Sequence, residues 1–148
     1  MSTSGRLDGV GPVTLSFTAN MRFVRPVRHF ICALCALADY DEEESESVAL
    51  VATEILNNSI EHGASGDDDE IDLTVEVTAD RFSIEVLDPG RGGRHFASTA
   101  LEQASHRPDL EEPRGRGLFL IRSYVDEMDI TYDPQVGTRL RAVKARKP

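Results

Sequence analysis

Two stretches of strictly alternating residues, 71–78 and 82–86, place the strongest constraint on the fold of this chain. Their apolar members are Ile71, Leu73, Val75, Val77, Phe82, Ile84 and Val86. Side chains alternate between the two faces of a strand, so the pattern predicts an antiparallel hairpin with one buried and one wet face. A sheet built on this hairpin needs a layer of helices over its apolar face.

Periodicity elsewhere in the chain supplies the remaining strands and the helices that cover the sheet. Strands are predicted at 13–18, 128–132 and 138–143, and helices at 21–38, 48–63 and 115–128. Pro26 requires the first helix to kink or to start near Arg25. The acidic run at 39–47 is expected to be a solvated turn between two helices. Together the elements predict an α/β (α+β) two-layer sandwich, in which helices cover one face of a mostly antiparallel five-stranded sheet.

Length and composition indicate a single soluble domain. The 148 residues are 40% hydrophobic and 28% charged, which fits one sizeable core. We expect a flexible N-terminal arm at 1–12, one domain at 13–144 and a short basic tail at 145–148. We also expect a cytoplasmic protein without a membrane segment, because the sequence has no long apolar run and no signal peptide. The net charge of −10 disfavours direct nucleic-acid binding, since phosphates would be repelled.

The two cysteines, Cys32 and Cys35, form a C-x-x-C pair. A redox or metal role is one interpretation, but no second pair exists to complete a zinc site. Their neighbours are apolar and helix-forming, which favours ordinary buried thiols.

The helix predicted at 48–63, "VALVATEILNNSIEHG", carries three polar residues at intervals of four: Glu54, Asn58 and His62. Four residues advance a helix by slightly more than one turn, so these side chains form one inclined stripe. A carboxylate and a carboxamide one turn apart can take a hydroxyl proton and ligate a hard cation. The alternative is a solvated polar stripe on an amphipathic helix.

Two glycine-rich turns, at 88–92 and 115–117, bracket a polar segment at 94–114. Glycine lets a backbone approach a ligand closely, and the second turn opens a helix whose free amides suit a phosphate chain. Asp88 follows a strand directly, where its carboxylate can accept a hydrogen bond from the amino group of a purine. A polar segment of this length in a compact domain is either a functional element such as a lid or disordered.

The order of these motifs is more specific than any one of them. It runs E-x-x-x-N-x-x-x-H-G on a helix, D-x-G-x-G after a hairpin, a polar lid, G-x-G opening a helix, and a Gly-Thr pair on the last strand. In this order the sequence resembles the Bergerat-fold (GHKL) ATP-binding superfamily. Within it, "RGRGLFLIRSYVDEMDI" and the compact length resemble the anti-sigma factor serine kinases, the switch-protein kinases of bacterial partner-switching systems. The resemblance extends from about Leu15 to Val143 and implies the Bergerat fold.

The resemblance implies a role for each residue that matches a family motif. Glu54 matches the general base for a substrate serine, Asn58 the Mg²⁺ ligand beside the ATP phosphates, and Asp88 the adenine-binding aspartate. The other matches are Gly90 and Gly92 in the adenine pocket, Gly115 and Gly117 at the phosphates, and Thr138, which supports the adenine site through water. From position and charge alone, Arg114 and Arg116 either neutralise phosphate charge or lie on the surface.

Three further positions near these motifs bear on the lid and on the choice of metal ligand. Gly93 stands where the family usually has a bulky apolar residue, which would loosen the lid. Asn57 offers a second carboxamide, although the spacing from Glu54 selects Asn58. His62 either contacts the lid or packs against the domain.

The activity implied by the resemblance is phosphorylation of a STAS-type anti-anti-sigma protein, with ATP and Mg²⁺ as cofactors, combined with sequestration of a sigma factor by a homodimer. Two alternatives remain: a non-catalytic, ATP-gated module that only binds partners, and a detached ATP-binding domain of a histidine kinase. Glu54 favours the kinase, because a pure binding module needs no base there. No phosphoacceptor-histidine helix pair precedes the motifs, which disfavours the last alternative.

Overall fold

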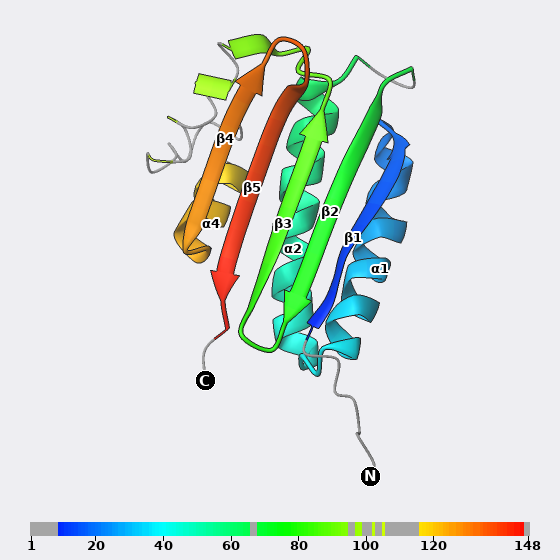
Figure 1. The fold of residues 1–148 in the computed structure, drawn as a ribbon, viewed down its shortest axis with the longest axis vertical. Coiled ribbons are helices and arrows are strands. Elements are labelled where there is room, and N and C mark those ends of the chain that lie inside the picture. Colours follow the sequence, from blue (N-terminus) through cyan, green and yellow to red (C-terminus); the bar gives the residue numbers. More distant parts are fainter. Residues whose placement is uncertain are drawn as a thin grey trace.

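The computed structural model describes residues 9–65, 68–94, 97–98, 102, 105 and 116–146. Within them, helices cover one face of a five-stranded sheet of order β1-β2-β3-β5-β4, and every neighbouring pair of strands is antiparallel (Figure 1). The strands are β1 (Gly9–Thr18), β2 (Glu70–Thr78), β3 (Arg81–Asp88), β4 (Glu127–Asp133) and β5 (Gly137–Ala145). The predicted two-layer sandwich is therefore confirmed.

The helices α1 (Val24–Leu37), α2 (Glu42–Asn58) and α4 (Arg116–Tyr124) lie behind the sheet in Figure 1. A short 3₁₀ turn, η1 (Met21–Phe23), precedes α1, and a π-helical turn, η2 (Ser59–Gly63), follows α2. Pro26 lies in the first turn of α1, where backbone N–H groups have no partner within the helix. The predicted start near Arg25 is thus correct to one residue.

The acidic run at 39–47 is not a turn, because α2 begins within it at Glu42. Asp41 caps the helix: its Oδ1 accepts from the Glu44 amide at 2.8 Å, and Glu44 Oε1 accepts from the Asp41 amide at 3.3 Å. The acidic residues that follow occupy the first turn, where the helix dipole favours negative charge. The prediction was wrong because D-x-x-E is a capping box, a signal that starts a helix.

Both ends of the domain extend further than predicted. β1 begins at Gly9, so the predicted arm at 1–12 is wrong for residues 9–12. Pro12 is accommodated because β1 is an edge strand whose register against β2 shifts between Val10 and Val13. At the other end, Ala145 still pairs with Arg81 of β3 and therefore belongs to the sheet rather than to a tail.

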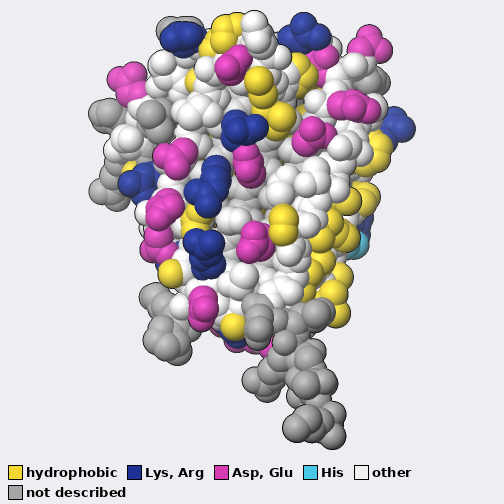
Figure 2. Space-filling view, in the orientation of Figure 1, with side chains coloured by type: hydrophobic (Ala, Val, Ile, Leu, Met, Phe, Trp, Pro, Cys, Tyr) yellow, Lys and Arg dark blue, Asp and Glu magenta, His cyan; other side chains and the backbone are white. Residues whose placement is uncertain are grey.

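The core lies between the helices and the covered face of the sheet. Its largest fully buried side chains are Ile31, Ile55, Leu56, Ile71, Leu73, Ile84, Val48, Val75, Val77, Val86 and Cys35. On the opposite face, Lys, Arg, Asp and Glu side chains alternate across the strands (Figure 2). This division follows the alternation that the sequence shows.

The two cysteines are structural. Cys35 is fully buried on α1, and burial raises its pKa to about 12. Cys32 is half-buried, and its pKa is also raised, chiefly by burial. Among the described residues no cluster of three or more His, Cys, Asp or Glu could hold a metal ion. A thiol with a raised pKa is a poor nucleophile and a poor ligand, so these observations agree with ordinary packed cysteines.

Candidate functional site

The residues predicted to bind adenine lie where β3 ends beside β5. Asp88 is the last residue of β3 and is only 3% exposed. Its Oδ1 accepts a hydrogen bond from the Gly90 amide at 2.8 Å. Burial raises the pKa of Asp88, and hydrogen bonds from Gly90, Ser59 and the Thr138 backbone partly offset this effect. Thr138 is the register partner of Asp88 on β5, so the structure brings these two predicted residues together.

Three glycines surround Asp88 with no space for a side chain. A Cβ on Gly63 would overlap the Asp88 carboxylate, and a Cβ on Gly137 would overlap the Asp88 carbonyl oxygen. A Cβ on Gly90 would lie 3.0 Å from the Tyr132 ring. Gly90 and Gly137 also have positive φ angles of 74° and 118°, which favour glycine. Gly63 is absent from the predicted site residues, although it ends the motif that contains Asn58.

The polar side chains of Asp88 and Thr138 have the chemistry that a purine base requires. Thr138 is only 3% exposed, and its Oγ1 has no hydrogen-bond partner among the described residues. Buried hydroxyls are normally paired, so this oxygen is suited to a ligand or to a water that a ligand holds. The Asp88 carboxylate is an acceptor for an exocyclic amino group. These two side chains therefore offer the hydroxyl and the acceptor that the family resemblance assigns to an adenine site.

The predicted catalytic residue lies where α2 faces α4. Glu54 is partly exposed on α2, and its carboxylate lies directly against the backbone of Gly117 in the first turn of α4. A Cβ on Gly117 would overlap Glu54 Oε2, so any other residue here would displace the Glu54 carboxylate. Asn58 is the last residue of α2, one turn beyond Glu54, and is also partly exposed. Asn57, which the spacing argument sets aside, buries its Oδ1 without a partner among the described residues.

The π-helical turn η2 ends the polar stripe at Asn58. A π turn contains more residues than an α turn, so the residue four positions after Asn58 does not complete a turn. His62 is exposed, and its Nε2 lies 3.7 Å from Glu61 Oε2. The predicted three-residue stripe is therefore wrong at His62. The same turn carries Ser59 and Gly63 to the Asp88 carboxylate instead.

Several predicted residues lie outside the part of the chain that the structure describes. Gly115 and Arg114 are among them, as is most of the predicted lid at 94–114. Arg116 begins α4, but the structure describes only its backbone and not its side chain. Gly92 is partly exposed in the turn after Gly90.

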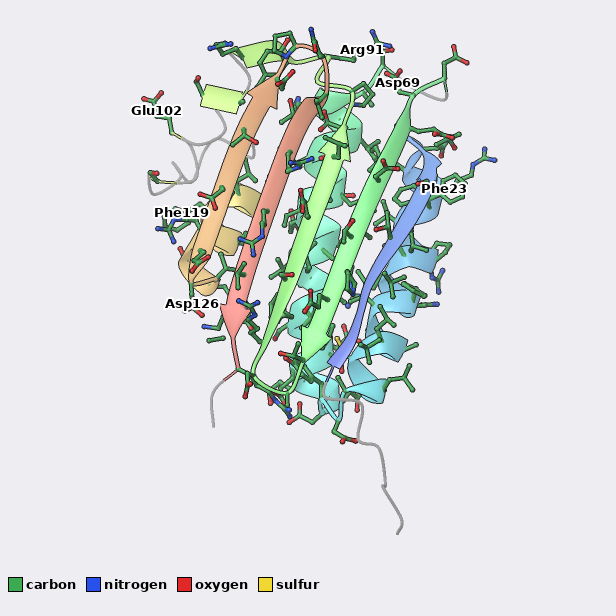
Figure 3. All side chains as sticks on the ribbon, in the orientation of Figure 1. Phe23, Asp69, Arg91, Glu102, Phe119 and Asp126 are labelled. Atoms are coloured by element: carbon green, nitrogen blue, oxygen red, sulfur yellow. The ribbon has the colours of Figure 1, made fainter. Side chains whose placement is uncertain are left out.

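An ion pair that sequence reasoning missed holds the turn beyond Asp88. Arg91 donates from Nε to Asp69 Oδ2 at 3.1 Å and from Nη2 to Asp69 Oδ1 at 2.9 Å. The side chain of Asp69 is 7% exposed, and the hydrogen bonds from Arg91 hold the pKa of its carboxyl well below the usual range. The Arg91 amide also donates to the Gly63 carbonyl at 3.0 Å. Figure 3 shows both side chains at the end of the sheet where β3 terminates.

The helices of the described residues include none that is long and apolar enough to span a membrane.

Comparison with known proteins finds relatives of two kinds. An anti-sigma F factor from Clostridium botulinum (strain Eklund 17B / Type B) is 27% identical over 133 residues, which cover 89% of this chain and 92% of the relative. The serine-protein kinase RsbW of Listeria monocytogenes serotype 4a (strain HCC23) is 28% identical over 134 residues, covering 84% of this chain and 82% of the relative.

The fold also recurs in a solved structure, that of the RsbU and RsbW domains of Rv1364c from Mycobacterium tuberculosis. The superposition has a TM-score of 0.60 at 17% identity and covers 94% of this chain and 34% of that longer chain. Residues 17–144 match the family model HATPase_c_2, described as a histidine kinase-like ATPase domain. Because the match covers most of the chain, the protein belongs to the family of histidine kinase-like ATPase domains, the GHKL group that its motif order resembles.

Proposed function

We propose that this protein is an ATP-dependent protein-serine kinase and anti-sigma factor, which phosphorylates a STAS-type anti-anti-sigma protein and sequesters a sigma factor. The names of the relatives, anti-sigma F factor and serine-protein kinase, support the two halves of the proposal. The observation that carries the kinase half is Glu54, a partly exposed carboxylate at the start of α4. A sigma factor acts in the cytoplasm, so the proposal includes this compartment.

The proposed nucleotide site combines the two regions described above. Asp88 and Thr138 would hold the adenine beside the turn that contains Gly90 and Gly92. The free amides at the start of α4 would face the phosphates. Oxygen donors suit Mg²⁺, and Asn58 supplies one beside the carboxylate of Glu54. Bound Mg²⁺ would neutralise charge on the phosphates.

The proposed reaction needs one proton acceptor. Glu54 takes the proton of the substrate serine hydroxyl while the serine oxygen forms a bond to the γ-phosphorus of ATP. The bond from that phosphorus to the bridging oxygen breaks, and its electron pair leaves with ADP. General-base assistance of this kind is typically worth about 10²–10⁴-fold in rate.

We also infer that the protein self-associates through the edge formed by β1 and α1. Apolar side chains of these elements stay partly exposed beside the core: Val13, Leu15, Phe17, Val24 and Phe30. Figure 2 shows hydrophobic side chains gathered along this edge of the molecule. A second copy would bury them, because an apolar edge strand is a ready interface. Sedimentation of a monomer at micromolar concentration, with and without ATP, would count against this inference.

The central experiment is incubation of the purified protein with γ-labelled ATP and the STAS-domain proteins encoded in the same genome. Transfer of label to a serine of one of them supports the proposal. Binding of a STAS protein and ATP without any transfer would instead identify a non-catalytic, ATP-gated module. Absence of ATP binding by calorimetry in millimolar Mg²⁺ would overturn the nucleotide site itself.

A further inference from the structure

Exposed apolar side chains gather in a groove between α2 and α4. Of the six large hydrophobic side chains exposed in the described residues, three meet there: Leu50 at 51%, Leu120 at 60% and Tyr124 at 39% exposure. With Ser47, Val51, Glu54 and Ile121 they line a hollow of about 230 Å³. An exposed apolar cluster rimmed by polar residues typically marks a binding surface.

The groove leads away from the proposed base. Glu54 lines it, and beyond Ser47 and Tyr124 it meets a second hollow of about 820 Å³ at the first turns of α2. That hollow includes Glu43 and Glu44. A chain lying in the groove would therefore contact Glu54, then apolar side chains, then an acidic region.

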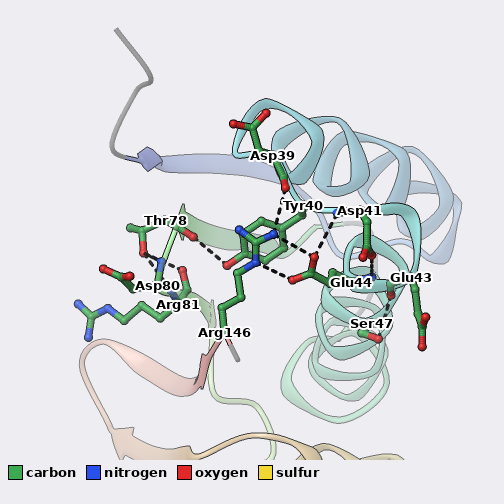
Figure 4. A network of polar contacts seen from close by, with 10 residues as sticks. All are labelled: Asp39, Tyr40, Asp41, Glu43, Glu44, Ser47, Thr78, Asp80, Arg81 and Arg146. Atoms are coloured by element: carbon green, nitrogen blue, oxygen red, sulfur yellow. Dashed lines mark hydrogen bonds and ion pairs between the residues drawn. The ribbon is translucent and has the colours of Figure 1, made fainter. Parts of the chain in front are cut away.

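The acidic region has an uncompensated charge at Glu43. Its neighbour Glu44 is neutralised by Arg146, which donates from Nε to Oε2 at 2.6 Å and from Nη2 to Oε1 at 3.0 Å (Figure 4). Lys144 lies 4.9 Å above the ring of Tyr124 and 3.9 Å from Asp126 Oδ1. The Glu43 carboxylate, in contrast, forms no ion pair with any described residue. This end of the groove is complementary to a cation.

Helix geometry sets the spacing of these features. Glu43, Ser47, Leu50 and Glu54 follow one another at intervals of four, three and four residues, so they lie along one side of α2. At 1.5 Å per residue, Leu50 is about 6 Å and Glu43 about 16 Å from Glu54 along the helix axis. An extended chain rises about 3.3 Å per residue. The first distance therefore corresponds to about two residues of an extended partner. The second corresponds to about five, but side chains alternate in direction along an extended chain, so the side chain that shares the serine's face and can reach Glu43 is that of a long residue about four positions away.

We propose that the groove between α2 and α4 binds the phosphoacceptor segment of the protein substrate. The segment is extended, with its serine hydroxyl at Glu54, a large apolar side chain about two residues away against Leu50 and Leu120, and a basic residue about four residues away whose long side chain reaches Glu43. This assignment rests on the proposed kinase function, because Glu54 acts there as the base.

The test uses a fluorescein-labelled peptide of sequence RALGSGLAR, which presents leucine and arginine on the serine's face in either chain direction. The labelled peptide is kept at a fixed low concentration, and its anisotropy is followed as the full chain is added up to about 1 mM. We expect saturable binding that Leu50→Ser and Leu120→Ser each weaken at least about tenfold, and that replacing both peptide leucines by serine weakens equally. The matched control is Leu37→Ser, because Leu37 is 64% exposed at the end of α1 and outside the groove. It should bind the peptide as the wild type does.

Three results would overturn the assignment. The first is that the wild type shows no saturable binding, and the second is that the groove variants bind the peptide as well as the wild type does. The third is that the wild type is a dimer and Leu50→Ser or Leu120→Ser is not, which would assign the groove to a second copy of the chain. Unchanged ATP affinity shows that the variants are folded. Labelled ATP in the same assay separates this proposal from the kinase proposal. If peptide binding depends on the groove but no phosphate is transferred, the groove assignment is supported and the kinase proposal is contradicted. If phosphate is transferred and the groove variants transfer it as fast as the wild type, the kinase proposal is supported and the groove assignment is contradicted.

Discussion

Gly63 and Asp88 lie so close together that the Cβ of any other residue at position 63 would overlap the Asp88 carboxylate. This contact joins the π-helical turn after α2 to the end of β3. The Arg91 amide adds a second link, because it donates to the Gly63 carbonyl at 3.0 Å. The helix that carries Glu54 and the turn that carries Asp88 therefore form one unit.

Gly63→Ala should lower ATP affinity, because the added methyl group displaces the Asp88 carboxylate from its position. We expect at least a tenfold loss, which corresponds to about 1.4 kcal/mol, measured by titration calorimetry in Mg²⁺. Gly9→Ala is the matched control, since its Cβ would lie 3.0 Å from the Thr78 side chain at the far end of the sheet. That variant should keep wild-type affinity. Wild-type affinity in Gly63→Ala would mean that the position of Asp88 does not matter for binding.

Asp88→Asn should abolish tight nucleotide binding without lowering the thermal stability of the nucleotide-free protein. Burial raises the pKa of Asp88, so the ionised carboxylate costs folding free energy at neutral pH. The asparagine oxygen can still accept from the Gly90 amide, but its amide group presents a donor where the purine amino group needs an acceptor. Calorimetry gives the affinity, and thermal melts give the stability.

The pH dependence provides the second check on Asp88. A carboxyl whose pKa is raised by folding destabilises the protein as the pH increases from its ordinary value, near 4, through the folded value. The Tm advantage of Asp88→Asn over the wild type should therefore shrink as the pH falls toward 4. A constant difference between pH 4 and pH 8 would contradict the assigned cause of the shift.

Alternation along the strands was enough to predict the sheet, and it placed Asp88 directly after a strand. It missed the last two residues of β5, which ends at Ala145, and Thr138 was assigned through the family resemblance alone. The sequence also gave the positions of Glu54 and Asn58, because helical spacing is regular up to Asn58. The prediction that His62 continues the same stripe was wrong, because no feature of the local sequence indicates a π turn. The pair Asp69 and Arg91 could not be found at all, since 22 residues separate them and only the packed loops bring them together.

Arg91→Ala should destabilise the protein at neutral pH and weaken ATP binding. It leaves the buried Asp69 carboxylate without its charged partner, with only the hydrogen bonds from Ser65, and it frees the turn after Asp88. Arg91 lowers the pKa of Asp69, so the pair stabilises the fold above the ordinary carboxyl pKa and loses this effect as the pH falls below it. Thermal melts from pH 7 down to about pH 2 should therefore show a shallower decline in Arg91→Ala than in the wild type.

The control for this pair is Arg139→Ala. Arg139 pairs with Glu85 at 2.5 Å on the open face of the sheet, where both side chains are substantially exposed. Exposed pairs contribute only about 0–1 kcal/mol, so this variant should shift the melts little and leave ATP affinity unchanged. In Asp69→Asn the carboxylate is already gone, and adding Arg91→Ala should cost less than it does in the wild type. Equal costs in both backgrounds would show that the two residues are not coupled.

Glu54→Gln separates the kinase from a pure binding module most sharply. The substitution keeps the shape of the side chain and an oxygen acceptor but removes the base. Phosphate transfer to a STAS partner should slow at least ~100-fold, while ATP affinity and partner binding stay near wild type. Asn58→Ala should instead weaken Mg²⁺-dependent ATP binding and transfer together, because it removes the proposed metal ligand. Both are measured with labelled ATP and calorimetry; transfer at the wild-type rate by Glu54→Gln would remove Glu54 from the mechanism.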